Sequence, residues 1–465
     1  MARQYDVIVI GSGPGGYIAA IRCAQLGLRT ACVEKEKSLG GTCLNVGCIP
    51  SKALLTSTEY YEWIQKESQK HGVNVQGAGI DFDKMMARKS EVVNGLTGGV
   101  AALFKGHKID RIEGQARFTS QNLIEVEKEG AKQVLESEHF IIATGSEPIP
   151  LPFLPFDEKR VLSSTGALSL PKIPKKLLVV GAGVIGVEIA SVYRRLGTGV
   201  VLVEMLDRIC PTMDGAISKA LLTILKKQGL EFHLQTKVTA GRVEDEGVVL
   251  TVEENQNISD IYADHVLVAV GRRPFTQGLG LKEIGVKVDK KGFVGINAHF
   301  QTSLPHIYAI GDVIEGPMLA HKASEEGVAA AEIIAGQNPE INYLTIPNVI
   351  YTHPEVAAVG MTEGEAREAG LDLLLGTCAL RALGRARCMG ETEGLMKVIG
   401  EKHSGRLIGM HLIAPHASEL IGEGVLALQN KMTLEELANA PHAHPALGEG
   451  IKEAALNALG RQLAF

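Results

Sequence analysis

The segment Asp6-Val7-Ile8-Val9-Ile10-Gly11-Ser12-Gly13-Pro14-Gly15-Gly16 decides the fold that this sequence predicts. Its first part is an unbroken apolar run, which is typical of a strand buried in a parallel sheet. The spacing Gly-x-Gly-x-x-Gly follows at once, at Gly11, Gly13 and Gly16. In a dinucleotide-binding loop these glycines make a tight turn, let the backbone approach a pyrophosphate and let a helix pack closely on the strand.

The residues that follow complete the unit. Residues 17–26 read as a helix of small and apolar residues, and residues 30–33 read as a second strand that ends on Glu34. The helix start would hold the pyrophosphate, and the acid would bind ribose hydroxyls. A dinucleotide-binding domain is therefore expected here.

The same unit recurs later in the chain. A strand at 176–180 precedes Gly181, Gly183 and Gly186, a helix follows, and a strand at 200–203 ends on Glu204. The first glycine and the acid are 23 residues apart in both copies (11 to 34 and 181 to 204). Two such units imply two bound nucleotides. A carboxylate at Glu204 would accept a hydrogen bond from a free 2′-hydroxyl and repel a 2′-phosphate, and the nearest arginine, Arg208, is four residues on, so NAD is favoured over NADP.

A second unusual stretch is Gly40-Gly41-Thr42-Cys43-Leu44-Asn45-Val46-Gly47-Cys48-Ile49-Pro50-Ser51-Lys52. A regular helix would place the two cysteine Cα atoms about 8–9 Å apart, whereas a disulfide needs about 4.4–6.8 Å. A disulfide therefore requires a distorted backbone, which Gly41 and Gly47 would allow. A bridge over so short a loop stabilises little and suits a disulfide that opens and closes during turnover. The alternative is two reduced cysteines at the start of a helix.

The composition limits the class of protein to which this chain can belong. The 465 residues suggest about three domains, and the net charge of −6 without a basic block makes a nucleic-acid partner unexpected. Seven cysteines, an odd number in a long chain, do not resemble a secreted disulfide framework. No apolar run is long enough to span a bilayer, and no leader is expected before the first strand. These features favour a cytoplasmic protein.

Between and after the two units the pattern changes. Residues 111–138 alternate polar and apolar residues like a small β-meander, which leads into a strand from residue 139. The proline-rich segment 148–155 reads as a linker to the second unit. From about residue 347, short strands at 356–359, 394–399 and 407–413 alternate with helices, which indicates an α+β domain.

The segment Pro441 to Glu449 carries two histidines, His442 and His444, between prolines, which predicts a rigid non-helical turn. One interpretation is a histidine base oriented by Glu449. Two others are surface histidines in a loop, or a metal site, for which no third clustered ligand is present.

Together these motifs resemble those of the pyridine nucleotide–disulphide oxidoreductases over essentially the whole chain. The resemblance implies an α/β fold with two Rossmann-like dinucleotide-binding domains, for FAD and NAD, and a C-terminal α+β dimerisation domain. The implied boundaries are 1–147 for the FAD-binding domain, 148–272 for the NAD-binding domain, 273–345 for a central segment that returns to the FAD domain, and 346–465 for the interface domain.

The resemblance also implies residue roles. Cys43 would exchange with substrate and Cys48 would face the flavin, while His444, held by Glu449, would be the base that reaches the disulfide of the other subunit. Lys52 would lie by the flavin ring and pair with Glu188. The FAD contacts would be Gly11, Gly13, Gly16, Glu34, Gly40, Gly41, Thr42, Lys52, Gly114, Thr144, Gly145, Asp312 and Ala320. The NAD contacts would be Gly181, Gly183, Gly186, Glu204, Val238 and Gly271. Ala446 and Gly448 depart from the family, which has hydroxyl residues there, and residues 381–389 match no role.

The implied reaction is oxidation of protein-bound dihydrolipoyl groups by NAD⁺, through FAD and a Cys43–Cys48 redox disulfide, in a homodimer. The partners would be the lipoylated acyltransferase of a 2-oxo acid dehydrogenase complex or the carrier protein of the glycine cleavage system. One alternative is an NADPH-driven reductase of glutathione or mercuric ions, against which Glu204 and the cysteine-free C-terminus count. The other is a redox-silent flavoprotein scaffold, against which the intact Cys43, Cys48, His444 and Glu449 count.

Overall fold

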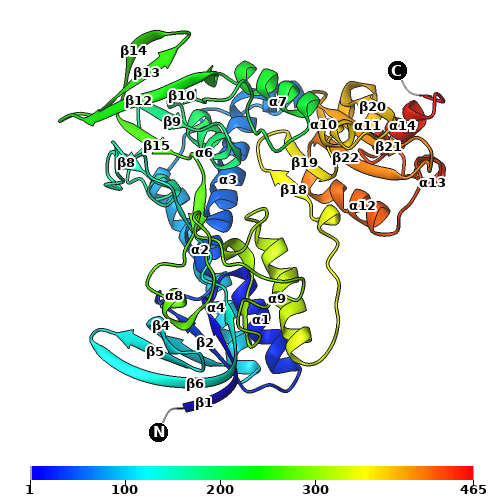
Figure 1. Cartoon of the computed structure of the whole chain (residues 1–465). Coiled ribbons are helices and arrows are strands. Elements are labelled where there is room, and N and C mark those ends of the chain that lie inside the picture. The colour runs from blue at the N-terminus through cyan, green and yellow to red at the C-terminus, as the bar shows by residue number, and fades with distance from the viewer. Residues whose placement is uncertain (1–2, 464–465) are drawn as a thin grey trace. The chain divides into compact units, whose positions relative to one another are not determined.

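The computed structural model describes residues 3–463, so the outermost residues of the two predicted terminal domains, 1–2 and 464–465, lie outside it. The chain forms two compact units, each built from discontinuous segments (Figure 1). The first unit comprises residues 1–54, 81–149 and 271–341, and the second comprises residues 55–80, 150–270 and 342–465. The four-part division made from the sequence stays a prediction.

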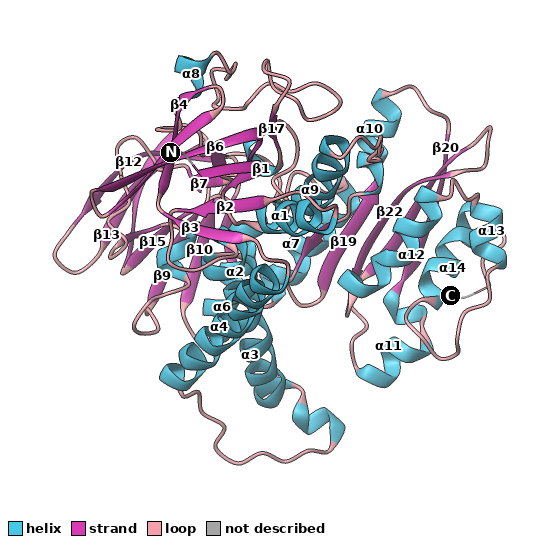
Figure 2. Cartoon of the chain, turned by 90° about the horizontal axis from the view of Figure 1, so that it is seen from below, coloured by secondary structure: helices cyan, strands magenta, loops and turns pink. Residues whose placement is uncertain are grey.

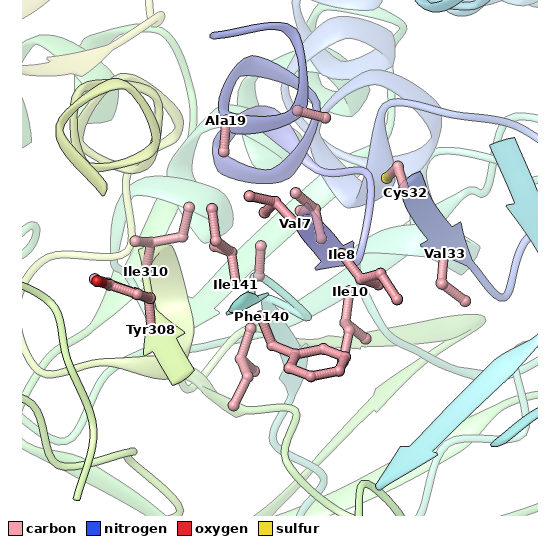
Figure 3. Packing of buried hydrophobic residues seen from close by; sticks show 14 of the residues in the cluster. Val7, Ile8, Ile10, Ala19, Cys32, Val33, Phe140, Ile141, Tyr308 and Ile310 are labelled. Atoms are coloured by element: carbon pink, nitrogen blue, oxygen red, sulfur yellow. The ribbon is translucent and has the colours of Figure 1, made fainter. Parts of the chain in front are cut away.

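The first unit is built on a parallel sheet in the order β3-β2-β1-β6-β17. Its strands are β1 (Arg3–Ile10), β2 (Thr30–Glu34), β3 (Asp110–Glu113), β6 (Ala131–Ile142) and β17 (Ile307–Ala309). The five residues of β2 are all buried, as expected when helices cover both faces of a parallel sheet. Figure 3 shows side chains of β1, β6 and β17 packed together beneath Ala19 of helix α1 (Pro14–Gln25). The predicted strand–loop–helix–strand unit is confirmed.

The predicted meander was right in part. Strand β4 (Gln115–Ser120) pairs antiparallel with β5 (Leu123–Lys128), and β5 pairs antiparallel with the first half of β6. The prediction was wrong at residues 111–113, which lie in β3 and pair parallel with β2. This strand has four residues and one buried side chain, Ile112. Its alternation of buried and exposed residues is the same in an antiparallel meander and beside β2, so the pattern does not show which strand is its neighbour.

Helices complete the first unit and link it to the second. Helix α9 (Ala320–Ile334) packs on α1. The redox stretch forms α2 (Gly41–Val46) and the start of α3 (Cys48–Lys66), whose later turns belong to the second unit. The first unit also contains α4 (Phe82–Gly106), α8 (Leu281–Ile284) and η2 (Gly311–Val313), whereas η1 (Ser68–His71) belongs to the second unit.

A short antiparallel ribbon marks where the chain leaves and re-enters the first unit. Strand β7 (Ser146–Pro148) pairs with β16 (Arg272–Pro274). The chain passes to the second unit after Ile149 and returns at Gly271. Both connections therefore start from one paired ribbon.

The second unit contains a parallel sheet in the order β11-β10-β9-β15-β8 and an antiparallel meander β12-β13-β14. The parallel strands are β8 (Val161–Leu162), β9 (Lys176–Val180), β10 (Gly199–Val203), β11 (Glu231–His233) and β15 (His265–Val268). The meander comprises β12 (Thr236–Val243), β13 (Val248–Glu254) and β14 (Asn257–Ala263). The helices are α5 (Ser164–Ala167), α6 (Val184–Arg195) and α7 (Gly215–Lys227). The predicted repeat of the dinucleotide unit is confirmed.

The C-terminal part carries an antiparallel sheet in the order β18-β19-β22-β21-β20, which confirms the predicted α+β character (Figure 2). Its strands are β18 (Asn348–Ile350), β19 (Glu355–Gly360), β20 (Leu373–Ala379), β21 (Leu395–Glu401) and β22 (Leu407–Ala414). Its helices are η3 (Tyr343–Thr345), α10 (Glu363–Glu368), η4 (Leu380–Ala382), α11 (Gly384–Met389), α12 (Ala417–Gln429), α13 (Leu434–Asn439) and α14 (Glu449–Ala458). Within residues 3–463, no helix is both long and apolar enough to cross a bilayer.

Candidate active site

The residues predicted to contact FAD gather at one edge of the first sheet. Gly11 follows β1, Glu34 ends β2, Gly114 follows β3, Thr144 lies just past β6 and Asp312 lies just past β17. All five strands run parallel, so their carboxyl ends meet at this edge. Ligands of open parallel sheets bind in this position.

The glycine loop after β1 combines two packed positions with one open position. A Cβ on Gly11 would lie 2.4 Å from the Ala143 carbonyl oxygen, and a Cβ on Gly16 would lie 1.9 Å from the Gly11 carbonyl oxygen. A Cβ on Gly13 would meet no atom within 4 Å. The loop is therefore held tightly by its outer glycines and leaves space at the middle one, so these residues fit a pyrophosphate at the start of α1.

Glu34 and Ser12 connect this loop to the redox stretch. Glu34 Oε2 accepts hydrogen bonds from the Ser12 backbone N–H at 2.9 Å and the Ser12 hydroxyl at 2.6 Å, and Oε1 accepts from the Glu36 N–H at 3.0 Å. The Gly40 N–H donates to the Ser12 carbonyl oxygen at 2.9 Å. A Cβ on Gly41 would lie 2.6 Å from Gly13 Cα, so the two backbones approach too closely for a side chain. Ser12, which sequence analysis missed because it fills a variable position of the motif, thus fixes the redox stretch against the nucleotide loop.

The second glycine loop repeats this geometry. A Cβ on Gly186 would lie 2.1 Å from the Gly181 carbonyl oxygen, while a Cβ on Gly183 would meet nothing within 4 Å. Glu204 accepts from the Ala182 N–H at 2.8 Å and from the Leu206 N–H at 2.9 Å, as Glu34 does from Ser12 and Glu36. These residues fit a second dinucleotide.

The helix is broken between the two cysteines, as the sequence predicts. Helix α2 ends at Val46, Gly47 has φ −133° and ψ −111°, and α3 begins at Cys48. A Cβ on Gly47 would lie 2.9 Å from the Thr42 carbonyl oxygen, so no larger residue fits there without a shift. The break turns the two thiols toward each other, and the two cysteines share a hydrogen bond.

The structure contains the reduced pair, with both Cys43 and Cys48 as thiols. The hydrogen bond with Cys48 is the largest cause that raises the pKa of the Cys43 thiol, burial and the Cys48 charge add to it, and Lys52 and the Cys48 backbone N–H act against it. The contact with Cys48 and burial therefore favour the protonated form of the Cys43 thiol.

Four of the other cysteines are unsuited to this chemistry. Cys23, Cys32, Cys210 and Cys378 are buried. Burial raises the pKa of Cys23 to about 12 and that of Cys378 to about 11. Such thiols stay protonated at neutral pH and behave as small apolar side chains.

The two histidines before α14 differ sharply. His442 has both ring nitrogens occupied, by the Ala440 carbonyl oxygen and by Glu423 Oε1, each at 3.0 Å. His444 contacts Glu449 Oε1 through Nδ1 at 2.8 Å, and its side chain is 78% exposed. A carboxylate only accepts, so Nδ1 carries the hydrogen and Nε2 of the neutral ring is the nitrogen that can take a proton. His444 therefore has the form of a base, whereas His442 is a structural residue.

Glu449 is itself held in place. Its Oε2 accepts from the Ala446 N–H at 2.9 Å. Burial raises the pKa of the Glu449 carboxyl, but the hydrogen bonds from Ala446 and His444 outweigh burial and bring the pKa below its ordinary value. A backbone N–H, that of Ala446, thus supports the loop that carries His444. Within the described residues no group of three or more histidine, cysteine, aspartate or glutamate side chains is placed to hold a metal ion.

Three other predicted site residues, Glu188, Val238 and Gly271, are described by their positions in the fold. Glu188 is buried in α6, where its Oε1 accepts from the Tyr351 N–H at 2.9 Å, and it lies in the second unit while Lys52 lies in the first. Their pairing stays a prediction. Val238 lies in β12, and Gly271 stands where the chain re-enters the first unit.

Comparison with known proteins identifies the family. A family model described as pyridine nucleotide-disulphide oxidoreductase matches residues 5–327, and the dimerisation domain of the same family matches residues 346–455. The chain belongs to the pyridine nucleotide-disulphide oxidoreductase family. It is therefore an oxidoreductase that uses FAD and NAD, and it carries a dimerisation domain.

Similar curated proteins span nearly the whole chain. Dihydrolipoyl dehydrogenase 1, mitochondrial, of Arabidopsis thaliana is 47% identical over 456 residues, which cover 97% of this chain and 90% of that protein. The dihydrolipoyl dehydrogenases of Pisum sativum and Homo sapiens, also mitochondrial by name, are 48% and 46% identical, over 97% and 99% of this chain and 91% and 92% of theirs.

Solved structures share the fold. LpdA of Mycobacterium tuberculosis matches with a TM-score of 0.90 at 26% identity, over 98% of this chain and 99% of that one. The HOCl-induced flavoprotein disulfide reductase RclA of Escherichia coli, as its Cu(II) complex, matches with a TM-score of 0.87 at 27% identity, over 97% and 99%. The fold is that of flavoprotein disulfide reductases, with Rossmann-like sheets and a C-terminal antiparallel dimerisation domain.

Proposed function

We propose that this chain oxidises protein-bound dihydrolipoyl groups to lipoyl groups, with NAD⁺ as the acceptor. The observation that carries the proposal is the hydrogen-bonded thiol pair Cys43 and Cys48 on a helix break, in a chain 46–48% identical to dihydrolipoyl dehydrogenases. A dithiol is the chemical match for such a pair, because thiol–disulfide exchange moves two electrons between two sulfur pairs.

FAD would be held at the carboxyl edge of the first sheet by Gly11, Gly13, Glu34, Thr144 and Asp312, with the other predicted FAD contacts around them. NAD would be held by the Gly181–Gly186 loop and Glu204. When bound, FAD accepts the electron pair of the reduced cysteines and NAD⁺ takes that pair as hydride. The protein supplies the binding, the orientation and the proton transfers.

The substrate step is an exchange of disulfides. His444 takes the proton of one dihydrolipoyl thiol through Nε2, because the thiolate is the attacking species. The thiolate attacks Cys43 of the oxidised pair, which breaks the Cys43–Cys48 bond and leaves the negative charge on Cys48. The second substrate sulfur then attacks the mixed disulfide. Lipoyl leaves as a disulfide, Cys43 and Cys48 are both reduced, and one electron pair has moved to the enzyme.

We place His444 and the cysteine pair that it serves in different subunits of a homodimer. The dimerisation domain matched at residues 346–455 contains His444 and Glu449, while the pair lies in the first unit. The exposed ring of His444 is then covered by the partner. Domain limits at 147, 272 and 345 would divide the chain between FAD binding, NAD binding, the return to the FAD domain and dimerisation.

The lipoyl group would be carried by an acyltransferase of a 2-oxo acid dehydrogenase complex or by a glycine cleavage carrier protein. The cytoplasmic location stays a prediction from composition, and the named relatives are mitochondrial. The NADPH-driven alternative is disfavoured because the Glu204 carboxylate, fixed by two backbone N–H groups, would stand against a 2′-phosphate.

Anaerobic titration tests the proposal. The purified protein is mixed with dihydrolipoamide, and flavin bleaching, free thiols and NADH formed after addition of NAD⁺ are followed. Reduction by dihydrolipoamide and hydride delivery to NAD⁺ are expected, with glutathione and NADPH far less effective. Flavin reduction by NADPH and glutathione disulfide turnover would support the alternative reductase, and a flavin that no thiol reduces would support the scaffold.

A further inference from the structure

A chain of hydrogen bonds in the first unit joins three residues that are far apart in the sequence. Arg272 donates from Nε to the Ser146 hydroxyl at 2.7 Å and from Nη2 to the Ser146 carbonyl oxygen at 2.6 Å. The Ser146 hydroxyl donates to Asp312 Oδ2 at 2.5 Å. Arginine has no acceptor, so the serine oxygen must accept from Nε and its single hydrogen is directed at Asp312.

The backbone beside Asp312 is fixed independently. The Gly311 N–H donates to Glu326 Oε2 at 2.8 Å, and Lys322 Nζ donates to the Gly311 carbonyl oxygen at 3.2 Å. Lys322 and Glu326 form an ion pair at 3.0 Å with side chains 1% and 0% exposed. The Lys322–Glu326 pair thus fixes the backbone of the turn at Gly311. The Asp312 side chain is oriented by its hydrogen bond from the Ser146 hydroxyl.

Arg272 differs from its neighbour in how its charge is used. Arg273 is exposed and pairs directly with Glu147 at 2.7 Å. Arg272 is half-buried and, in the described part of the chain, no carboxylate pairs with it directly. Burial lowers the pKa of the Arg272 guanidinium, while the charges of Asp312, Cys48 and Glu147 raise it. The guanidinium is joined to the Asp312 carboxylate through the Ser146 hydroxyl, with no direct ion pair between them.

We propose that Arg272 is a positioning residue of the flavin site, which orients the Asp312 carboxylate through Ser146 and keeps one positive charge beside it. This inference rests on the proposed FAD site, because Asp312 is one of the residues predicted to contact FAD. A fixed positive charge favours addition of electrons nearby, and an oriented carboxylate favours retention of the cofactor.

Four variants of the holoenzyme separate the two effects. Arg272→Gln removes the charge and is expected to lower the equilibrium constant for two-electron flavin reduction about threefold to tenfold, which is about 15–30 mV. Arg272→Lys keeps the charge and should leave the potential unchanged. Ser146→Ala removes the hydroxyl that joins Arg272 to Asp312, and FAD should dissociate about threefold to tenfold faster from this variant. The matched control Arg273→Gln should change neither quantity.

The measurements are flavin midpoint potential against a reference dye and the rate of FAD release by fluorescence. Potentials of Arg272→Gln and Arg273→Gln that agree within error, together with unchanged FAD release from Ser146→Ala, would overturn the proposal. If Arg272→Gln does not fold, Ser146→Ala, which keeps the charge, decides the proposal: faster FAD release supports it and unchanged FAD release overturns it. A wild-type protein purified without FAD would instead overturn the proposed function itself.

Discussion

The pair of His444 and Glu449 allows a direct test of the proposed base. Glu449→Gln keeps the shape of the side chain and removes its charge, while Glu423→Gln does the same to the carboxylate that contacts His442 at 3.0 Å. The two histidines are two residues apart and each contacts one glutamate, so the second variant is a matched control. Only the first is expected to slow the reaction.

The magnitude follows from the geometry. When His444 takes the substrate proton it becomes a cation 2.8 Å from Glu449 Oε1. Unit charges about 4 Å apart attract by about 1 kcal/mol in water and about 4 kcal/mol near a protein surface. With His444 exposed in one subunit and covered in the proposed dimer, about 2 kcal/mol is a reasonable middle value, and each 1.4 kcal/mol or so is a factor of ten in rate. A loss of about 30-fold in kcat with dihydrolipoamide is therefore expected for Glu449→Gln.

Two assays make the result decisive. Turnover of dihydrolipoamide with NAD⁺ requires the base, whereas oxidation of NADH by an artificial one-electron acceptor bypasses the thiol step and should be unchanged in both variants. A loss below about threefold for Glu449→Gln, or an equal loss for Glu423→Gln, would refute the reasoning and return His444 to a surface residue of a loop.

Three further predictions concern the pair, the nucleotide and a buried ion pair. Cys43→Ser and Cys48→Ser should each retain FAD and lose turnover of dihydrolipoamide, as measured by NADH formation. Glu204→Ala should weaken NAD⁺ binding by about tenfold and reduce the preference over NADP⁺, as measured by kcat/KM for each nucleotide. Lys397→Met should cost about 3–5 kcal/mol of the free energy of unfolding in urea, since it leaves the buried Asp214 carboxylate without its cation at 2.8 Å.

The controls and the pH dependence follow from the same contacts. Cys388→Ser, which changes an exposed cysteine outside the pair, should keep full turnover. Retained turnover in Cys43→Ser or Cys48→Ser would contradict electron transfer through the cysteine pair.

Burial raises the pKa of Asp214, but the hydrogen bonds from Lys397 and from the Glu363 N–H lower it overall. The Lys397–Asp214 ion pair therefore makes its full contribution to the free energy of unfolding above the unfolded pKa of Asp214, about 3.9. This contribution is lost as the pH falls through the lower pKa of Asp214 in the folded protein. A wild-type unfolding midpoint that rises on acidification through this range would contradict this sign.

Local patterns allowed much of the site to be predicted. The break at Gly47 follows from two cysteines five residues apart that must approach each other, and the contact of His444 with Glu449 lies within a six-residue segment. The paired loops at Gly11 and Gly181 follow from their glycine spacing and the strand on either side. Each of these features is decided by neighbours in the sequence.

Other features depend on residues that are distant in the chain. Ser146 meets Arg272 across 126 residues and Asp312 across 166, and no periodicity marks such a contact. The placement of residues 111–113 beside β2 is also a choice between possible neighbours that a four-residue strand does not encode. Residues 381–389 form η4 and α11, which explains their conformation and assigns them no role.

The position of β17 in the first sheet has a consequence for synthesis on the ribosome. This strand pairs with β6, yet Ile307 emerges 165 residues after Ile142 (307 − 142). At about 5–20 residues per second, β6 waits roughly 8–33 s for its neighbour. Meanwhile the strands from β8 to β15, which pair only with one another, are synthesised in between. The nascent chain thus holds an open sheet edge during that interval, which is where a chaperone or a misplaced strand would act.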